Sequence, residues 1–277
     1  MMETLAPTAL GLNRAAGRFG THYAIGGDGP WLVLIHGVGL DLHMWSRQVA
    51  ALEKIRRVLR YDLIGHGETP PAGGPLSLAD FVSQLYELLN LLGVERADLA
   101  GFSLGAMVAQ AFALEHPAML EKLALINGVY ARSDEARADV LARLRQVETA
   151  GLESAIEASL SRWFTEGFRS NHPGEIEKIE KRLRANAREG FLPAYRLFAD
   201  ADAELAGRLA AIRAPTLVVT GEHDSGSTPE MARHMREDIP GAVLRVIPGV
   251  RHLLPVEASD ALNVLLVEFL SGEVGST

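Results

Sequence analysis

The clearest candidate for chemistry is a serine between two glycines. Residues 99–105 have the sequence LAGFSLG, which contains the pattern G-x-S-x-G at Gly101, Ser103 and Gly105. An apolar run precedes the pattern and a helical pattern follows it, so Ser103 is expected on a sharp strand-to-helix turn. Such a turn strains the serine backbone, and glycine neighbours avoid clashes there. The pattern is short enough to arise by chance, but this context favours Ser103 as a nucleophile near a helix N-terminus.

A serine hydroxyl attacks a carbonyl at neutral pH only when a neighbouring base removes its proton, and histidine is the usual base. Among the nine histidines, His252 lies in a loop between the last predicted strand and the C-terminal helix. This position favours His252 as the base. His36 ends a predicted strand, where we expect it to brace a loop. Five further histidines are expected on solvated surfaces: His22, His66, His116, His172 and His234.

Asp224 is the strongest candidate for the group that orients this histidine. It ends the sequence LVVTGEHD, in which a predicted strand is followed by a turn, so its carboxylate is expected at the same edge of the sheet as the serine. A carboxylate there can hold the imidazole tautomer and stabilise the imidazolium. Glu222 and His223 are near alternatives. Asp62 is a distant alternative at another strand end, where neighbouring glycines suggest a structural turn.

A turn with two glycines follows the first strongly apolar run. Residues 36–39 have the sequence HGVG after WLVLI, and glycines let the backbone approach a ligand closely. The backbone N–H groups of Val38 and Leu104 are therefore the predicted oxyanion hole. Four side chains are predicted to bind substrate: Met44, Trp45, Trp163 and Leu253.

These residues require a sheet that places them along one edge. Short apolar runs alternate with longer segments of helical period, which indicates an α/β fold with a mostly parallel central sheet and helices on both faces. The predicted strands are 31–36, 57–62, 97–102, 122–127, 216–221 and 243–247. Residues 21–26 predict an antiparallel edge strand. The predicted crossover helices are 78–92, 104–115, 229–236 and 258–270.

Residues 128–212 lack strand-like runs and are rich in Ala, Arg, Glu and Leu at helical spacing. We expect them to form a helical lid inserted into a core made of residues 1–127 and 213–277. Aromatic residues of the insertion could line a pocket, although any one of them more often only packs. An anionic substrate would need a cation near this pocket, and the candidates are Arg132, Arg162 and Arg196.

The composition bounds the remaining properties. The chain has 277 residues, a net charge of −8 at pH 7 and 48% hydrophobic residues, which is typical of a globular domain and gives no electrostatic reason to bind nucleic acid or a membrane surface. The absence of cysteine excludes thiolate nucleophiles and Cys-ligated metals. No signal peptide or membrane span is recognised, so a cytoplasmic protein is expected. The sequence leaves open whether the chain forms a homo-oligomer.

The motifs HGVG, YDLIGHG, GFSLG, GEHD and VRHLLPVE occur in the order found in α/β-hydrolases, and the chain resembles that family over nearly its whole length. HGVGLDLHMW, RVLRYDLIGHGET, LINGVY and RWFTEGF resemble the 3-oxoadipate enol-lactonase branch. This resemblance implies an α/β-hydrolase fold and a small acidic ester or lactone as substrate under a helical lid. The chain departs from the branch in two places. Its acid loop is one residue longer, and Leu104 and Ala106 replace the usual Met and Gly.

Together the residues and the resemblance predict a serine hydrolase that cleaves a small ester or lactone through an acyl-enzyme, without a cofactor or a metal. A second hypothesis is C–C bond hydrolysis of a ring-cleavage dienol acid, although such relatives usually have Asn and Trp where Phe102 and Leu253 stand. A cofactor-free perhydrolase or haloperoxidase is a third. A ligand receptor on the same fold, which can keep an intact triad, is a fourth.

Overall fold

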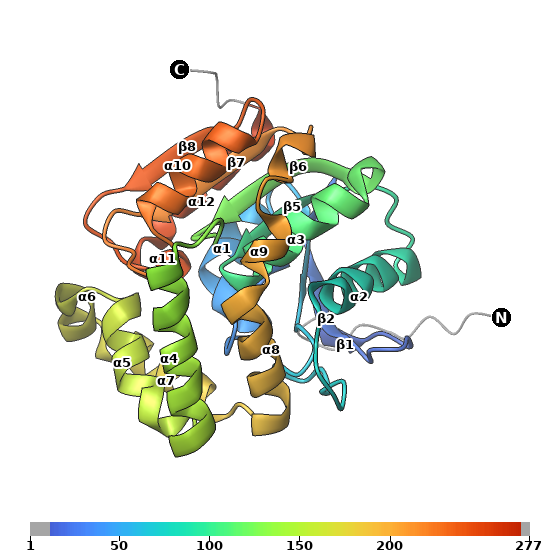
Figure 1. Cartoon of the computed structure of the whole chain (residues 1–277). Coiled ribbons are helices and arrows are strands. Elements are labelled where there is room, and N and C mark those ends of the chain that lie inside the picture. Colours follow the sequence, from blue (N-terminus) through green and yellow to red (C-terminus); the bar gives the residue numbers. More distant parts are fainter. Residues whose placement is uncertain (1–11, 273–277) are drawn as a thin grey trace.

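The computed structural model describes residues 12–272, and these form a sheet of eight strands flanked by helices (Figure 1). The order of strands across the sheet is β1-β2-β4-β3-β5-β6-β7-β8. In chain order the strands are β1 (Leu12–Arg14), β2 (His22–Gly26), β3 (Trp31–Ile35), β4 (Arg57–Tyr61), β5 (Ala97–Phe102), β6 (Leu120–Ile126), β7 (Thr216–Gly221) and β8 (Val243–Ile247).

The strands from β4 to β8 across the sheet pair in parallel, as predicted. The predicted bounds of β5, β7 and β8 are confirmed, and the other three parallel strands differ by one or two residues at their ends. The predicted antiparallel strand is present as β2, but the prediction that it forms the edge is wrong. Among the described residues β1 pairs with its outer side and takes that place.

Each face of the sheet is covered by its own helices. Val33 and Ile35 of β3 pack into one apolar cluster with helices α2 (Leu78–Leu91), α3 (Leu104–Glu115) and α10 (Pro229–Asp238). Leu32 and Leu34 point the other way, into a second cluster with α1 (Ser46–Leu52) and α12 (Ser259–Ser271). Because successive side chains of a strand point to opposite faces, a strand buried on both faces is apolar throughout. This is why WLVLI shows no alternation.

The segment between β6 and β7 contains only helices in the structure. Figure 1 shows α4 to α8 gathered beside the sheet. The helices are α4 (Asp134–Ala150), α5 (Glu153–Trp163), α6 (Glu166–Asn171), α7 (Pro173–Arg184), α8 (Arg188–Asp200) and α9 (Asp202–Leu205), followed by the 3₁₀ turn η3 (Leu209–Ala211). Here we call residues 128–212 the helical segment. Its role as a lid stays a prediction.

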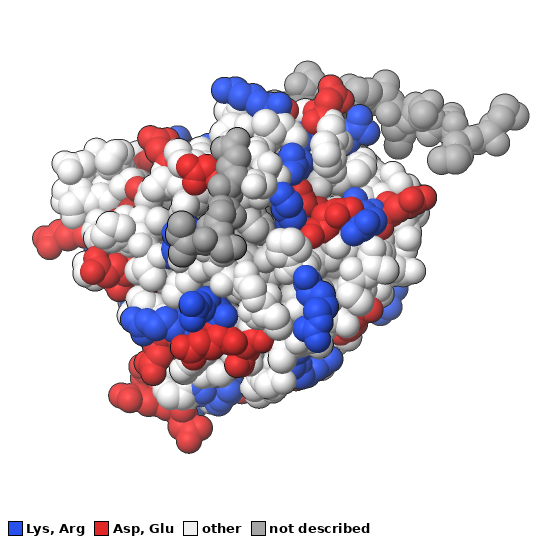
Figure 2. All heavy atoms as spheres, turned by 90° about the horizontal axis from the view of Figure 1, so that it is seen from above, with Lys and Arg blue, Asp and Glu red and all other residues white. Residues whose placement is uncertain are grey.

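Short helices complete the described part of the chain. η1 (Leu42–Trp45) and α11 (Leu254–Glu257) lie in the loops after β3 and β8, and η2 (Pro117–Met119) connects α3 to β6. No helix within residues 12–272 has the length and apolar character needed to cross a bilayer. The face shown in Figure 2 carries acidic and basic side chains next to one another, so neither sign dominates that face.

Candidate active site

Ser103 occupies the turn between β5, which ends at Phe102, and α3, which begins at Leu104. Its backbone angles are φ 54° and ψ −113°, a left-handed conformation that costs a non-glycine residue on the order of 1–3 kcal/mol. A Cβ atom on Gly101 would lie 2.2 Å from the carbonyl oxygen of Gly105, and one on Gly105 would lie 2.3 Å from that of Ile35. The motif therefore requires glycine at both positions, and the turn directs the serine to the carboxyl edge of the sheet.

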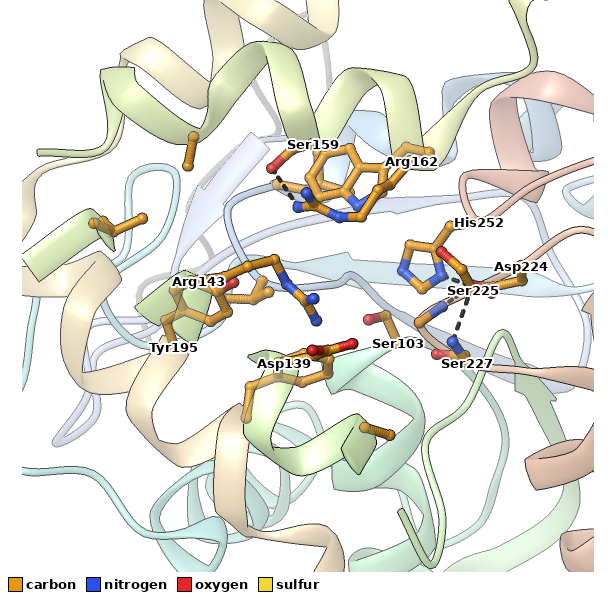
Figure 3. A pocket seen from close by; sticks show the side chains of 18 of the residues that line it. Ser103, Asp139, Arg143, Ser159, Arg162, Tyr195, Asp224, Ser225, Ser227 and His252 are labelled. Carbon is orange, nitrogen blue, oxygen red and sulfur yellow. Dashed lines mark hydrogen bonds and ion pairs between the residues drawn. The ribbon is translucent and has the colours of Figure 1, made fainter. Parts of the chain in front are cut away.

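Asp224 and His252 meet at the same edge from loops after β7 and β8. Nδ1 of His252 lies 2.7 Å from Oδ2 of Asp224, and both residues are buried. In Figure 3 the imidazole lies between Asp224 and Ser103. No hydrogen bond joins His252 to Ser103 within the described residues, although both line one pocket. Contacts of this kind are often long before substrate binds. The structure thus brings the three predicted residues together.

The carboxylate of Asp224 is held by three further donors. Oδ1 accepts the N–H groups of Gly226 and Ser227 at 2.8 and 2.9 Å, and Oδ2 accepts the side-chain amide of Asn127 at 2.8 Å. The additional residue in the acid loop is thus accommodated in a turn that donates to the acid. Burial acts to raise the pKa of Asp224, but His252 and the hydrogen bonds outweigh it, so the pKa lies below its ordinary value. The carboxylate is ionised at neutral pH.

Asn127 is a residue that sequence reasoning missed. It follows β6, is fully buried, and has a positive φ of 45°. Its N–H donates to the carbonyl oxygen of Val219 on β7, which fixes the side chain beside Asp224. The signal in the sequence was an amide at the carboxyl end of a buried parallel strand, where several strand ends meet.

The predicted oxyanion groups belong to the residue after Ser103 and to the turn after β3. Leu104 is the first residue of α3, so its N–H has no acceptor within the helix. The N–H of Val38 has no acceptor among the described residues, and Val38 lines the pocket with Ser103. Both groups are therefore free to donate to a bound oxygen. Their assignment as an oxyanion hole stays a proposal.

His36 braces the turn that carries Val38, as expected. The ring is fully buried; Nδ1–H donates to the carbonyl oxygen of Gly37 at 2.8 Å, and Nε2 accepts the N–H of Leu63 at 2.9 Å. Burial lowers its pKa, although nearby Asp62 acts in the opposite direction. The neutral ring links the turn after β3 to the turn after β4.

The alternative acids face elsewhere. Asp62 accepts N–H groups from Leu42 and Glu68 and contacts His22 at 2.7 Å, so it organises the turn after β4. Glu222 accepts the N–H of Gly249. The expectation that His22 and His66 are solvated is wrong, because the loops around Asp62 fold over both rings.

The pocket above Ser103 has a volume of about 230 Å³ and is walled by the core on one side and the helical segment on the other. Of the predicted substrate-binding side chains, Trp163 lines it. As a correction, Met44 lines a second cavity against α7, and Trp45 and Leu253 are fully buried in the core. Proximity in sequence to the catalytic motifs did not reveal which way these side chains point. The aromatic wall residues include Phe191, Tyr195 and Phe198.

The three candidate arginines have different surroundings. Arg132 lines the pocket, but its guanidinium is buried against Asp202 at 2.9 Å. Arg196 is exposed and pairs with Glu148. As a correction, neither is available for an anionic substrate. Arg162 lines the pocket together with Arg143, which sequence reasoning missed.

The loop that carries His252 is hydrogen-bonded to the helical segment. The N–H of Leu253 donates to the carbonyl oxygen of Trp163 at 3.0 Å. Glu257 accepts the N–H of Arg251 at 3.0 Å with one oxygen and the N–H of Thr165 at 2.9 Å with the other. Arg251 in turn donates to the carbonyl oxygen of Phe164 at 3.2 Å. The position of the imidazole thus depends on both parts of the chain.

Known proteins match this chain over most of its length. A sequence model described as alpha/beta hydrolase fold matches residues 30–259. An (E)-2-((N-methylformamido)methylene)succinate hydrolase of Acinetobacter baylyi is 32% identical over 254 residues, which cover 90% of this chain and 93% of the relative. A crystal structure of the enol-lactonase from Burkholderia xenovorans has a TM-score of 0.86 at 31% identity and covers 94% of this chain and 100% of its own.

A thermophilic esterase from Thermogutta terrifontis, solved with malate bound, has a TM-score of 0.83 at 30% identity, with coverage of 95% of this chain and 98% of the esterase. Within residues 12–272 no group of three or more His, Asp or Glu side chains is arranged to hold a metal ion. The predicted fold and the resemblance to enol-lactonases are confirmed, and the matches support a hydrolase. The chain belongs to the α/β-hydrolase family.

Proposed function

We propose that this protein is a serine hydrolase that cleaves a small ester or lactone bearing a carboxylate, with Ser103 as nucleophile, His252 as base and Asp224 as the acid that orients it. The contact of 2.7 Å between His252 and Asp224, in the wall of the pocket that contains Ser103, carries the proposal. A buried carboxylate beside Nδ1 places the proton on that nitrogen and leaves Nε2 free to accept the serine proton.

The reaction proceeds in two stages. His252 takes the hydroxyl proton while Oγ of Ser103 forms a bond to the carbonyl carbon, and the N–H groups of Val38 and Leu104 stabilise the negative oxygen. The tetrahedral intermediate then expels the leaving oxygen, which takes the proton from His252. A water molecule, deprotonated by His252, attacks the acyl-enzyme and releases the acid and the free serine.

The names of three relatives support parts of this substrate class. One is named for hydrolysis of a substituted succinate, one is an enol-lactonase, and one is an esterase with malate bound. The first and third names contain a carboxylate, and the second and third name enzymes of lactone or ester bonds. The first names no ester or lactone, so the carboxylate is the better supported part. A pocket of about 230 Å³ is consistent with a small substrate.

The test compares the parent protein with Ser103→Ala and, as a matched control, Ser225→Ala, which alters another serine of the same pocket. Labelling by a fluorophosphonate and turnover of short p-nitrophenyl esters and small lactones are measured. We expect Ser103→Ala to keep its unfolding temperature but to lose labelling and at least about 10⁴-fold in kcat. The control should retain both.

Full esterase activity in a folded Ser103→Ala variant would show that the serine assignment is wrong. Labelling of the parent protein without turnover of any ester or lactone would instead indicate a ligand receptor. Turnover restricted to dienol acids would favour C–C bond hydrolysis. Either of these last two outcomes would overturn the proposed reaction.

A further inference from the structure

Two arginines of the helical segment face the pocket from different helices. Arg143 belongs to α4 and Arg162 to α5, and both line the pocket that contains Ser103. In Figure 3 the guanidinium of Arg143 points toward Ser103 from one side, and that of Arg162 lies at the top of the pocket beside Ser159. Two cations from separate helices thus converge above the nucleophile.

Helical periodicity places each arginine on the inner face of its helix. On α4 the pocket is lined by Glu135, Ala136, Asp139, Arg143 and Val147, of which Glu135, Asp139, Arg143 and Val147 recur every four residues and form one stripe. On α5 and at its N-cap the pocket is lined by Leu152, Ala155, Ile156, Ser159, Arg162 and Trp163. This α5 lining is otherwise apolar apart from a single serine. An arginine on such a face is unusual because burial of an unpaired charge is unfavourable.

Neither guanidinium has a carboxylate partner within residues 12–272. Arg162 donates to the hydroxyl of Ser159 at 3.0 Å. The two other arginines predicted as anion-binding candidates have carboxylate partners: Arg132 pairs with Asp202 and Arg196 with Glu148.

Two acidic residues, Glu135 and Asp139, line the same pocket. Neither forms an ion pair with Arg143 or Arg162 in the part of the chain that the structure describes. Figure 3 shows the carboxylate of Asp139 beside the guanidinium of Arg143 without a hydrogen bond between them. The N–H groups of the two arginines are therefore not taken up by these carboxylates.

The two cations also repel each other. Burial lowers the pKa of Arg162, the charge of Arg143 lowers it further, and Tyr195 acts in the opposite direction. A partly buried guanidinium loses part of its hydration, which is unfavourable. A second positive charge nearby makes its charged form less favourable still. An anion bound between the two would relieve both effects. A planar carboxylate matches the fork of N–H groups on a guanidinium and can accept two hydrogen bonds from it.

We propose that Arg143 and Arg162 bind the non-reacting carboxylate of the substrate while its ester or lactone carbonyl lies at Ser103. This inference rests on the proposed function for the reacting end and assigns the specificity of the same site. It also predicts the behaviour of the product. Hydrolysis creates a second carboxylate at the serine, so a short dicarboxylate fits both ends of the pocket and competes with the substrate.

The first experiment measures binding without turnover. Isothermal titration calorimetry measures the affinity for succinate, glutarate and adipate in four proteins that all carry Ser103→Ala. They are the Ser103→Ala parent and the same protein with Arg143→Gln, with Arg162→Gln and with both changes. We expect at least one dicarboxylate to bind, and each single change to weaken its affinity about 10- to 100-fold. Arg196→Gln is the matched control, because it removes a cation of the helical segment that does not line the pocket; it should leave affinity unchanged.

The second experiment uses the active enzyme and compares kcat/KM for monomethyl glutarate with that for dimethyl glutarate. The arginine variants should lower the ratio of the two kcat/KM values, charged ester over neutral ester, about 10- to 100-fold, because the neutral ester lacks the carboxylate that the arginines bind. Arg162→Lys keeps the charge without the fork and should give an intermediate result. Unfolding temperatures show whether each variant is folded.

Equal dicarboxylate affinity in the double variant and its parent would overturn the assignment, as would the absence of dicarboxylate binding in both. Because binding is measured with the serine removed, this failure is distinct from failure of the proposed hydrolysis. If the enzyme hydrolyses esters but its preference for the charged ester does not depend on the arginines, the proposed hydrolysis stands and the carboxylate site is wrong.

Discussion

The core and the helical segment differ in how they hold charge at the pocket. In the core, Asp224 is buried and has partners for both oxygens: His252, Asn127 and two backbone N–H groups. In the helical segment, Arg143 and Arg162 are partly buried and lack an acidic partner in the described residues. A charge that is satisfied by the protein is preorganised for a fixed task, whereas one left without a partner is available to a ligand. By this comparison the core carries the proposed chemistry, and the helical segment carries the proposed selection of the substrate.

Ion pairs and hydrogen bonds hold the helical segment together and connect it to the core. Within the segment, Asp202 pairs with Arg132 at 2.9 Å and with Arg137 at 3.1 Å. These pairs tie the end of the segment that returns to the sheet to the end that leaves it. Near the active site, Glu257 accepts N–H groups from both Arg251 and Thr165. Glu257 therefore connects the segment to the loop that carries His252.

The largest expected effect is loss of activity on changing the preorganised acid. Asp224→Asn should lower kcat about 10⁴-fold, because the amide no longer selects the tautomer of His252 that accepts the serine proton. Kinetics with a short p-nitrophenyl ester measure this. Asp139→Asn is the matched change in the helical segment, since Asp139 also lines the pocket, and we expect it to lower kcat less than about tenfold. Similar losses in both variants would remove the distinction between the regions.

The next effect concerns stability of the helical segment. Asp202→Asn should lower the free energy of unfolding by about 3–5 kcal/mol, because it leaves the buried guanidinium of Arg132 without its counter-charge. Urea unfolding and limited proteolysis between residues 128 and 212 report the change. Glu148→Gln breaks the exposed pair with Arg196 and should cost less than about 1 kcal/mol. Equal costs would mean that the Asp202 contact does not anchor the segment.

The smallest effect is a pH dependence that arises in the core. His66 is fully buried beside His36, and its burial, followed by the charge of His36, lowers its pKa to about 3 from 6.5. Below pH 6.5 the unfolded chain therefore binds a proton that the native protein does not, so stability is full above pH 6.5 and falls toward pH 3. Between pH 6.5 and 4.5 His66 should contribute a loss of about 2 kcal/mol.

Urea unfolding at several pH values tests this effect. His66→Gln should reduce the loss between pH 6.5 and 4.5, whereas His234→Gln, a change of an exposed histidine on α10, should leave it unchanged. The same pH dependence in His66→Gln and the parent would show that His66 is not responsible.

Much of the fold was predictable because it depends on short-range patterns. A strand buried on both faces must be apolar throughout, and a helix must repeat its apolar residues every three or four positions. These constraints located the parallel strands within two residues. They did not locate the short strand β1, which has three residues and no distinct pattern. Because β1 pairs with β2, β2 is not the edge strand that the sequence predicted.

The sequence by itself determined the turn at Ser103 and the loops that carry Asp224 and His252. Only glycine fits at Gly101 and Gly105, so the motif specifies the backbone there. The order of loops along a parallel sheet then brings their ends to one edge.

The tertiary structure decided which other side chains reach that edge. Asn127 contacts Asp224 because β6 and β7 are neighbours in the sheet. Arg143 and Arg162 face the pocket without a carboxylate partner in the described residues. The guanidinium of Arg132 instead pairs with Asp202, which lies 70 positions further along the chain. The direction of a side chain on an amphipathic helix depends on how helices pack against one another. That packing is a contact between distant parts of the chain, and local spacing does not encode it.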